Sequence, residues 1–101
     1  MKAYTVVLSP NPDSHWISVS CPAMPGAVSQ GKTRAEALRN MQESMGGWYE
    51  VAREQGFQPL EETPELVGEW VKKILQDRVE EGWDLRVETT SLTPTIAVPV
   101  G

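Results

Sequence analysis

The stretch Ala3–Cys21, AYTVVLSPNPDSHWISVSC, decides the fold, because it holds two β-type runs separated by a turn. Residues 3–8 are β-branched and aromatic, which favours a strand. Pro12 and Asp13 suit a turn. Residues 15–21 alternate, so that every second side chain faces the same side of a strand. We therefore expect an antiparallel hairpin with one half-buried face.

The alternation in the second run assigns its side chains to two faces. The face predicted to enter the core carries Ile17, Val19 and Cys21. The opposite, polar face carries Trp16, Ser18 and Ser20. Because Cys21 is the one cysteine of the chain, an internal disulfide and a thiolate zinc cage are excluded, and we expect a small core side chain there.

A third strand and a long helix follow the hairpin. Residues 27–30 lie between turn signals at Pro25-Gly26 and Gly31. Thr33 and Glu36 form a capping box, which predicts the start of a helix. Its apolar stripe ends near Gly56 and consists of Leu38, Met41, Met45, Trp48 and Ala52. Gly46-Gly47 inside this helix indicates either a close contact with the sheet or a kink.

A second helix and two more β-type runs complete the chain. Thr63-Pro64 predicts a helix start, and the apolar face that follows closes at Gly82, giving a helix over about 64–82. Residues 85–91 and 96–100 read as strands, with Pro99 favouring an edge position for the last.

These elements predict one α+β domain over residues 1–101, in the order β-β-β-α-(α)-β. A helical crossover can make the strand that follows it parallel to the first strand. We expect the sheet order 3-2-1-4, with both helices on one face.

The net charge of −5 is concentrated in one segment. Residues 56–84 contain three basic and eight acidic side chains, a balance of −5, while the other segments nearly cancel. This distribution disfavours nucleic-acid binding through a basic face and makes a basic protein partner plausible. The alternative is a solvated helix face, which is what charge runs usually form.

Several motifs together resemble the HicB-like antitoxin family. They are residues 4–8 and 16–20, Pro22-Ala-Met-Pro-Gly26, residues 28–33 with Glu36-Ala-Leu38, the distal Trp48, Gly56 and Pro59, and Val98-Pro-Val100. The resemblance implies a partial RNase H-like fold and an antitoxin that neutralises a small RNA-cleaving HicA toxin by direct binding. The positions expected to shape the family fold are Pro22, Pro25, Gly26, Gly31, Thr33 and Glu36.

The chain departs from the family pattern in three ways. Ala23 and Ala27 stand where the family usually has an acidic residue and a cysteine. The acidic helix over about 64–82 reads as an insertion before the final strand. The sequence stops at Gly101, without the helix-turn-helix or ribbon-helix-helix segment of self-regulating members, so we expect no direct DNA binding.

The types and spacing of the residues favour a binding function over a catalytic one. An RNase H-type nuclease needs core-strand carboxylates that hold two divalent ions about 4 Å apart, yet residues 3–8 contain none and Asp13 lies in a turn. His15 and Cys21 stand roughly 20 Å apart along one strand and cannot act as a pair. We expect no catalytic residue, metal site or cofactor, and a protein that is not an enzyme.

The favoured function is an antitoxin that sequesters a small basic HicA-type ribonuclease. The partner-binding residues expected on this hypothesis are Trp16, Ser18, Ser20, Glu61, Glu62, Glu65 and Glu69. The alternative is an orphan oligomeric binding module of the same fold, with another protein or a small ligand as partner. Surplus apolar surface favours a homo-oligomer. No run approaches the ~18 apolar residues of a membrane span, which predicts a cytoplasmic location.

Overall fold

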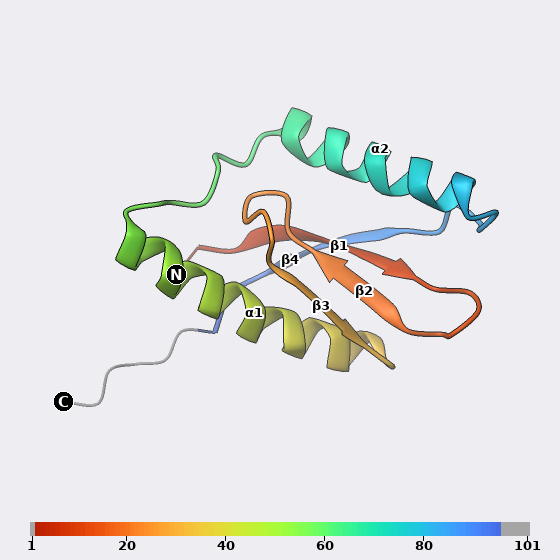
Figure 1. Cartoon of the computed structure of the whole chain (residues 1–101), viewed down its shortest axis with the longest axis horizontal. Coiled ribbons are helices and arrows are strands. Elements are labelled where there is room, and N and C mark those ends of the chain that lie inside the picture. The colour runs from red at the N-terminus through yellow and green to blue at the C-terminus, as the bar shows by residue number, and fades with distance from the viewer. Residues whose placement is uncertain (1, 96–101) are drawn as a thin grey trace.

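A four-stranded sheet with one helix on each face forms the protein, as a computed structural model that describes residues 2–95 shows (Figure 1). In chain order, its elements are β1 (Tyr4–Pro10), β2 (Ile17–Ser20), β3 (Val28–Gly31), α1 (Arg34–Gln55), α2 (Pro64–Glu80) and β4 (Glu88–Leu92). The strand predicted over 96–100, which includes Val98-Pro-Val100, lies outside the described residues.

The sheet order β3-β2-β1-β4 confirms the prediction, but the direction of the last strand does not. All three strand pairs are antiparallel, with Tyr4 opposite Leu92 in the β1–β4 pair. The prediction of a parallel last strand is wrong, because two helices separate β3 from β4. Each helix reverses the chain once, so β4 runs opposite to β3 and to β1.

β4 also begins later than the run over 85–91 suggested. The Asp84 carboxylate accepts hydrogen bonds from the Arg86 backbone N–H at 3.0 Å and from Arg78 Nη2 at 3.0 Å. These bonds hold residues 84–86 against the end of α2 and outside the sheet. The strand therefore starts at Glu88 and ends at Leu92.

The two helices cover opposite faces of the sheet, so the prediction that both pack on one face is wrong. Val19 lies opposite Leu8 on the face that α1 covers, whereas Ser20 lies opposite Val7 on the other. On that second face, Trp70 Nε1 of α2 donates to Ser20 Oγ at 2.8 Å. In Figure 1, α2 accordingly lies above the sheet and α1 below it.

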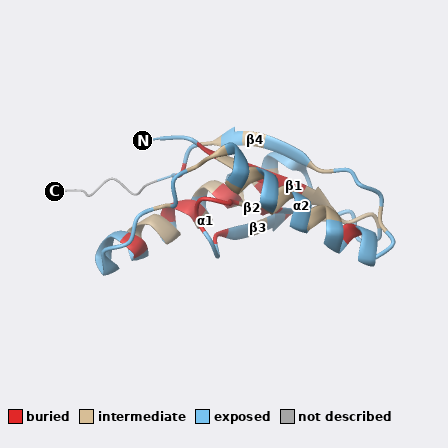
Figure 2. Cartoon of the chain, turned by 90° about the horizontal axis from the view of Figure 1, so that it is seen from above, coloured by how far each residue is buried: buried red, intermediate tan, exposed pale blue. Residues whose placement is uncertain are grey.

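The main core lies between the sheet and α1, as the alternation in β2 predicted. Its buried side chains are Tyr4, Val6, Leu8, Val19, Cys21, Ala23, Met24, Ala27, Ala37, Met41 and Met45. Figure 2 shows this buried layer inside an exposed shell. Cys21 is a free, buried thiol, and burial raises its pKa. It is a core side chain, as expected.

The ends of both helices follow the predicted caps. The Thr33 hydroxyl accepts from the Glu36 backbone N–H at 3.1 Å, and the Thr63 hydroxyl accepts from Leu66 N–H at the same distance. Gly56, at a φ of 80°, ends α1 in the left-handed conformation that glycine tolerates best. Local capping chemistry therefore sets these boundaries.

Gly46 allows the segment after β4 to cross α1. Thr95 N–H donates to the Gln42 carbonyl at 3.1 Å, and Gln42 Nε2 donates to the Thr93 carbonyl at 3.0 Å. A Cβ at Gly46 would overlap the backbone carbonyl of Thr95. The close contact is thus with residues 93–95 rather than with the sheet. The helix α1 continues through both glycines, from Arg34 to Gln55.

Gly46→Ala is expected to destabilise the protein by about 1–3 kcal/mol, because the added methyl group forces the crossing segment away from α1. Gly47→Ala is the matched control, since a Cβ there meets nothing within 4 Å. That substitution is expected to stabilise α1 by about 0.5–1 kcal/mol. Urea unfolding followed by circular dichroism measures both. Equal stabilities of the two variants would contradict the crossing.

Candidate functional site

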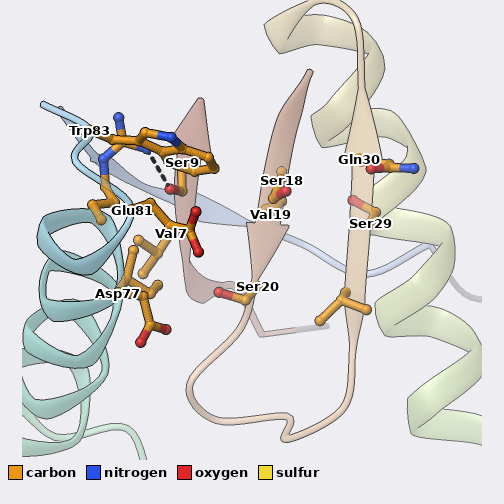
Figure 3. Close-up of a pocket in the computed structure, with 13 residues that line it drawn as sticks. Val7, Ser9, Ser18, Val19, Ser20, Ser29, Gln30, Asp77, Glu81 and Trp83 are labelled. Atoms are coloured by element: carbon orange, nitrogen blue, oxygen red, sulfur yellow. Dashed lines mark hydrogen bonds between the residues drawn. The ribbon is translucent and has the colours of Figure 1, made fainter. Parts of the chain in front are cut away.

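A groove of about 740 Å³ lies between α2 and the part of the sheet that α2 leaves uncovered. Figure 3 shows α2 on one side of this groove and β2 and β3 on the other. The polar strand side chains that line it include Ser9, Ser18, Ser20 and Gln30. The helix side contributes Ile74, Asp77, Arg78, Glu81 and Trp83. We call this space the α2–β3 groove.

Arg78 fixes the position of α2 on the sheet. It is 2% exposed. Its Nε donates to the Asp84 carbonyl at 2.6 Å and its Nη1 donates to Ser9 Oγ at 2.9 Å and to the Pro10 carbonyl. The ring of Trp83 lies 5.4 Å from the guanidinium. This set of contacts, with the Asp84 carboxylate as counter-ion, ties the end of α2 to β1.

The charge presented by the α2–β3 groove is therefore acidic. The Arg78 cation is paired with Asp84 at 3.0 Å, while Asp77 and Glu81 are exposed carboxylates at the helix side. In Figure 3 their side chains extend from α2 near the strand serines. A serine hydroxyl both donates and accepts, whereas an ionised carboxylate only accepts. The groove thus offers mixed hydrogen-bonding groups and negative charge.

The predicted partner-binding strand residues are only partly brought together. Ser18 and Ser20 both line the α2–β3 groove. Trp16 does not line it and instead has its ring 5.6 Å from Lys32 Nζ. The strand begins at Ile17, so the face alternation used to place Trp16 does not extend to that residue.

The predicted acidic residues also divide into different environments. Glu62 turns inward, where its carboxylate accepts from the Thr5 backbone N–H at 2.6 Å and from Thr5 Oγ at 3.0 Å. Glu61, Glu65 and Glu69 are exposed and lie outside the groove. Of the groove acids, Asp77 was not singled out from the sequence, and Glu81 was considered only as part of the acidic segment. Their spacing of four, on the same side of α2 as Trp70 and Ile74, was the available signal.

The six positions expected from the family motif lie in the β2–β3 connection, at the end of β3 and at the start of α1. Pro22 is buried, and the Pro25 carbonyl accepts from Trp48 Nε1 at 2.8 Å. Gly26 has a φ of 96°, which suits glycine. Gly31 packs against the backbone at Ala37, and Thr33 caps α1 at the Glu36 amide.

Two further properties concern residues 2–95 only. In this part of the chain, three or more His, Cys, Asp or Glu side chains do not gather closely enough to hold a metal ion. Neither described helix combines the length and apolar character needed to span a membrane.

No protein-family model matches the chain, whereas a curated protein is similar to part of it. The chain is 40% identical over 47 residues to a UPF0150 protein of Thermoplasma acidophilum. These residues make up 46% of this chain and 67% of that protein.

The structure is similar to two crystal structures of an antitoxin from Burkholderia pseudomallei. The N-terminal domain of antitoxin HicB matches with a TM-score of 0.62 and 22% identity, over 94% of this chain and all of that domain. A second HicB structure matches with a TM-score of 0.61 and 18% identity, over the whole of this chain and 76% of the other. The α+β fold that the resemblance implied is confirmed.

Arg78→Met is expected to lower the free energy of unfolding by about 2–3 kcal/mol, because it removes several hydrogen bonds from a buried cation. Arg86→Met is the matched control. The Arg86 side chain is 74% exposed, so loss of its pair with Asp84 should cost less than about 1 kcal/mol. Chemical denaturation measures the difference. A similar cost for both would show that Arg78 does not fix α2.

The stability of the protein should also fall in acid through Asp84. Hydrogen bonds from the Arg86 backbone N–H and from the Arg78 and Arg86 side chains hold the pKa of Asp84 below its usual value. Because the pKa of Asp84 is lower in the folded than in the unfolded chain, its ionised carboxylate stabilises the folded protein at pH values above the unfolded pKa of about 3.9. This stabilisation is lost as the pH falls through the pKa of the folded state. Asp84→Asn should flatten the stability profile below about pH 4, measured by thermal unfolding. An unchanged profile would contradict this role.

Proposed function

Because the chain belongs to the HicB-like UPF0150 family, we propose that it is an antitoxin that neutralises a small basic HicA-type ribonuclease toxin. Neutralisation occurs by direct protein binding, without a reaction catalysed by this chain. The fold shared with the HicB N-terminal domain supports the proposal, as does the acidic segment over 56–84. The proposed location is the cytoplasm, where such a toxin would meet RNA.

The observation that carries the proposal is the acidic, partly polar α2–β3 groove beside the sheet face of β2 and β3. Lys and Arg side chains that grip RNA phosphates pair equally well with carboxylates. Asp77 and Glu81 can therefore take the place of phosphate against the RNA-binding surface of the toxin. Ser18 and Gln30, both exposed, offer hydrogen bonds beside them. Binding of this kind excludes RNA by occupying the same basic residues.

The acids outside the groove have a different proposed role. Glu61, Glu65 and Glu69 are exposed on the solvent side of the α2 region. Charges at an interface rim mainly raise the rate of association with a partner of opposite sign. This effect is screened by salt, over a Debye length of about 8 Å at physiological ionic strength. Trp16, whose ring lies beside Lys32, remains a predicted contact outside the groove.

That α2 is an insertion relative to other family members remains a prediction. A homo-oligomeric state also remains a prediction. The helix itself is present over Pro64–Glu80.

The first experiment is recovery of the tagged full chain from its host at low and high salt, with mass spectrometry of bound proteins. We expect one stoichiometric basic protein of under about 100 residues, released by salt because charge pairs dominate the contact. Addition of this chain to the purified partner should then suppress RNA cleavage. Recovery of the chain alone would contradict the proposal and favour an orphan oligomeric module.

The groove is tested by charge reversal once the toxin is purified. Asp77→Lys combined with Glu81→Lys should weaken toxin binding at least tenfold, because two charge pairs become repulsive. Glu65→Lys with Glu69→Lys changes the net charge equally outside the groove and should mainly slow association. Surface plasmon resonance measures both variants. If the second pair weakens equilibrium binding more than the first, the toxin does not bind in the groove.

A further inference from the structure

A second groove lies between the β2–β3 connection and the C-terminal half of α1, across the sheet from the α2–β3 groove. Its volume is about 530 Å³. One wall is the turn Pro25-Gly26 with Ala27. The other wall is α1 at Trp48 and Val51, with Phe57 just beyond the end of the helix. We call this space the α1 notch.

The α1 notch is apolar and open to solvent. All the residues of the described chain that line it are uncharged. Val51 is 53% exposed and Phe57 is 63% exposed. Trp48 Nε1 donates to the Pro25 carbonyl at 2.8 Å, which fixes the indole ring and satisfies its polar atom. Contiguous exposed apolar side chains mark a surface that binds another protein.

A row of acidic side chains borders the α1 notch. Gly47, which lines the notch, lies four residues after Glu43 and three before Glu50, so these positions share one side of the helix, as does Glu54. None of the three acids forms an ion pair with another residue of 2–95. Arg53 lines a different pocket. The notch therefore fits a partner that inserts an apolar side chain and carries basic residues around it.

We propose that the α1 notch binds an apolar side chain of the same basic toxin whose cationic residues enter the α2–β3 groove, an inference that rests on the proposed function. The two sites meet at β3, the edge strand of the sheet. Ala27 and Val28 are consecutive, yet Ala27 lines the notch and Val28 lines the α2–β3 groove. A protein that reaches over the edge of β3 therefore contacts both sites.

The backbone of the β3 edge is itself covered by α1. Ser44 Oγ donates to the Val28 carbonyl at 2.9 Å, and Asn40 Nδ2 donates to the Gln30 carbonyl at the same distance. Figure 3 shows α1 beside β3, with α2 at the other end of the view. An edge covered in this way is protected from pairing with another strand. A partner at this edge is therefore held by side chains, which the two grooves can receive.

The two contacts should respond differently to salt. Charge pairs in the α2–β3 groove are screened as the ionic strength rises. Burial of an apolar side chain in the α1 notch follows from the apolar area removed from water and involves no charge. The charge pairs thus supply the part of the affinity that salt removes, and the notch supplies a smaller part that salt leaves in place.

The test is the dissociation constant of the purified toxin for the full chain, measured by surface plasmon resonance at several salt concentrations. Val51→Ser should weaken binding about tenfold at every salt concentration, because that factor corresponds to the burial of one apolar side chain. Val79→Ser is the matched control, since Val79 lies on α2 outside both sites and is 62% exposed. It should bind the toxin as the wild type does. Asp77→Lys with Glu81→Lys should instead change the salt dependence.

A second variant fills the α1 notch without removing a side chain. A Cβ at Gly47 meets nothing within 4 Å, and leucine favours a helix more than glycine does. Gly47→Leu should therefore fold at least as stably as the wild type, which circular dichroism and urea unfolding check. Its side chain should occupy the notch and weaken toxin binding about tenfold, again at every salt concentration.

The outcomes distinguish a failure at the notch from a failure of the proposed function. If the wild-type chain inhibits RNA cleavage and folded Val51→Ser and Gly47→Leu bind the toxin equally well, the notch contact is overturned and the proposed function stands. If the wild-type chain neither binds nor inhibits the toxin, both are overturned. If the two variants change the mass of the chain alone in sedimentation but not its affinity for the toxin, a second copy occupies the notch, which also overturns the proposal.

Discussion

The burial of β1 on both faces is the constraint on which the other elements depend. Val6 and Leu8 enter the core under α1, while Val7, between them, is 1% exposed beneath α2. A strand with apolar side chains on both faces needs cover on both. One helix on each side meets that need, but neither spans the whole sheet. The polar face of β2 and β3 is left open, and the α2–β3 groove is the result.

The helix α2 therefore presents different side chains to the sheet, to the groove and to solvent. Toward the sheet, Arg78 and Trp70 anchor it through Ser9 and Ser20. On one flank, Asp77 and Glu81 present charge to the groove; on the other, Val71, Leu75 and Val79 present apolar surface. The solvent side carries acids. A helix with so many separate contacts fixes the position of the proposed toxin site relative to the sheet.

Features set by neighbouring residues, such as helix ends, were predictable from the sequence. Contacts between residues far apart in the chain were less predictable. Thr33, Thr63 and Gly56 act on their own neighbours, so the helix ends could be predicted from them. The continuous run Val6-Val7-Leu8 contained the signal for two covered faces, but the alternation of β2 suggested only one. Glu62 and Asp77 are both acids in one charged segment, and only the fold shows that Glu62 binds Thr5 while Asp77 faces the groove.

The pairing of β1 with β4 joins the two ends of the described chain, since Tyr4 lies opposite Leu92. Contacts between residues so far apart in sequence slow folding, because a long loop must close before they form. During synthesis, β1 can form its hairpin early, yet its other edge stays unpaired until β4 has left the ribosome. Completion of the sheet therefore follows the synthesis of the hairpin and of both helices.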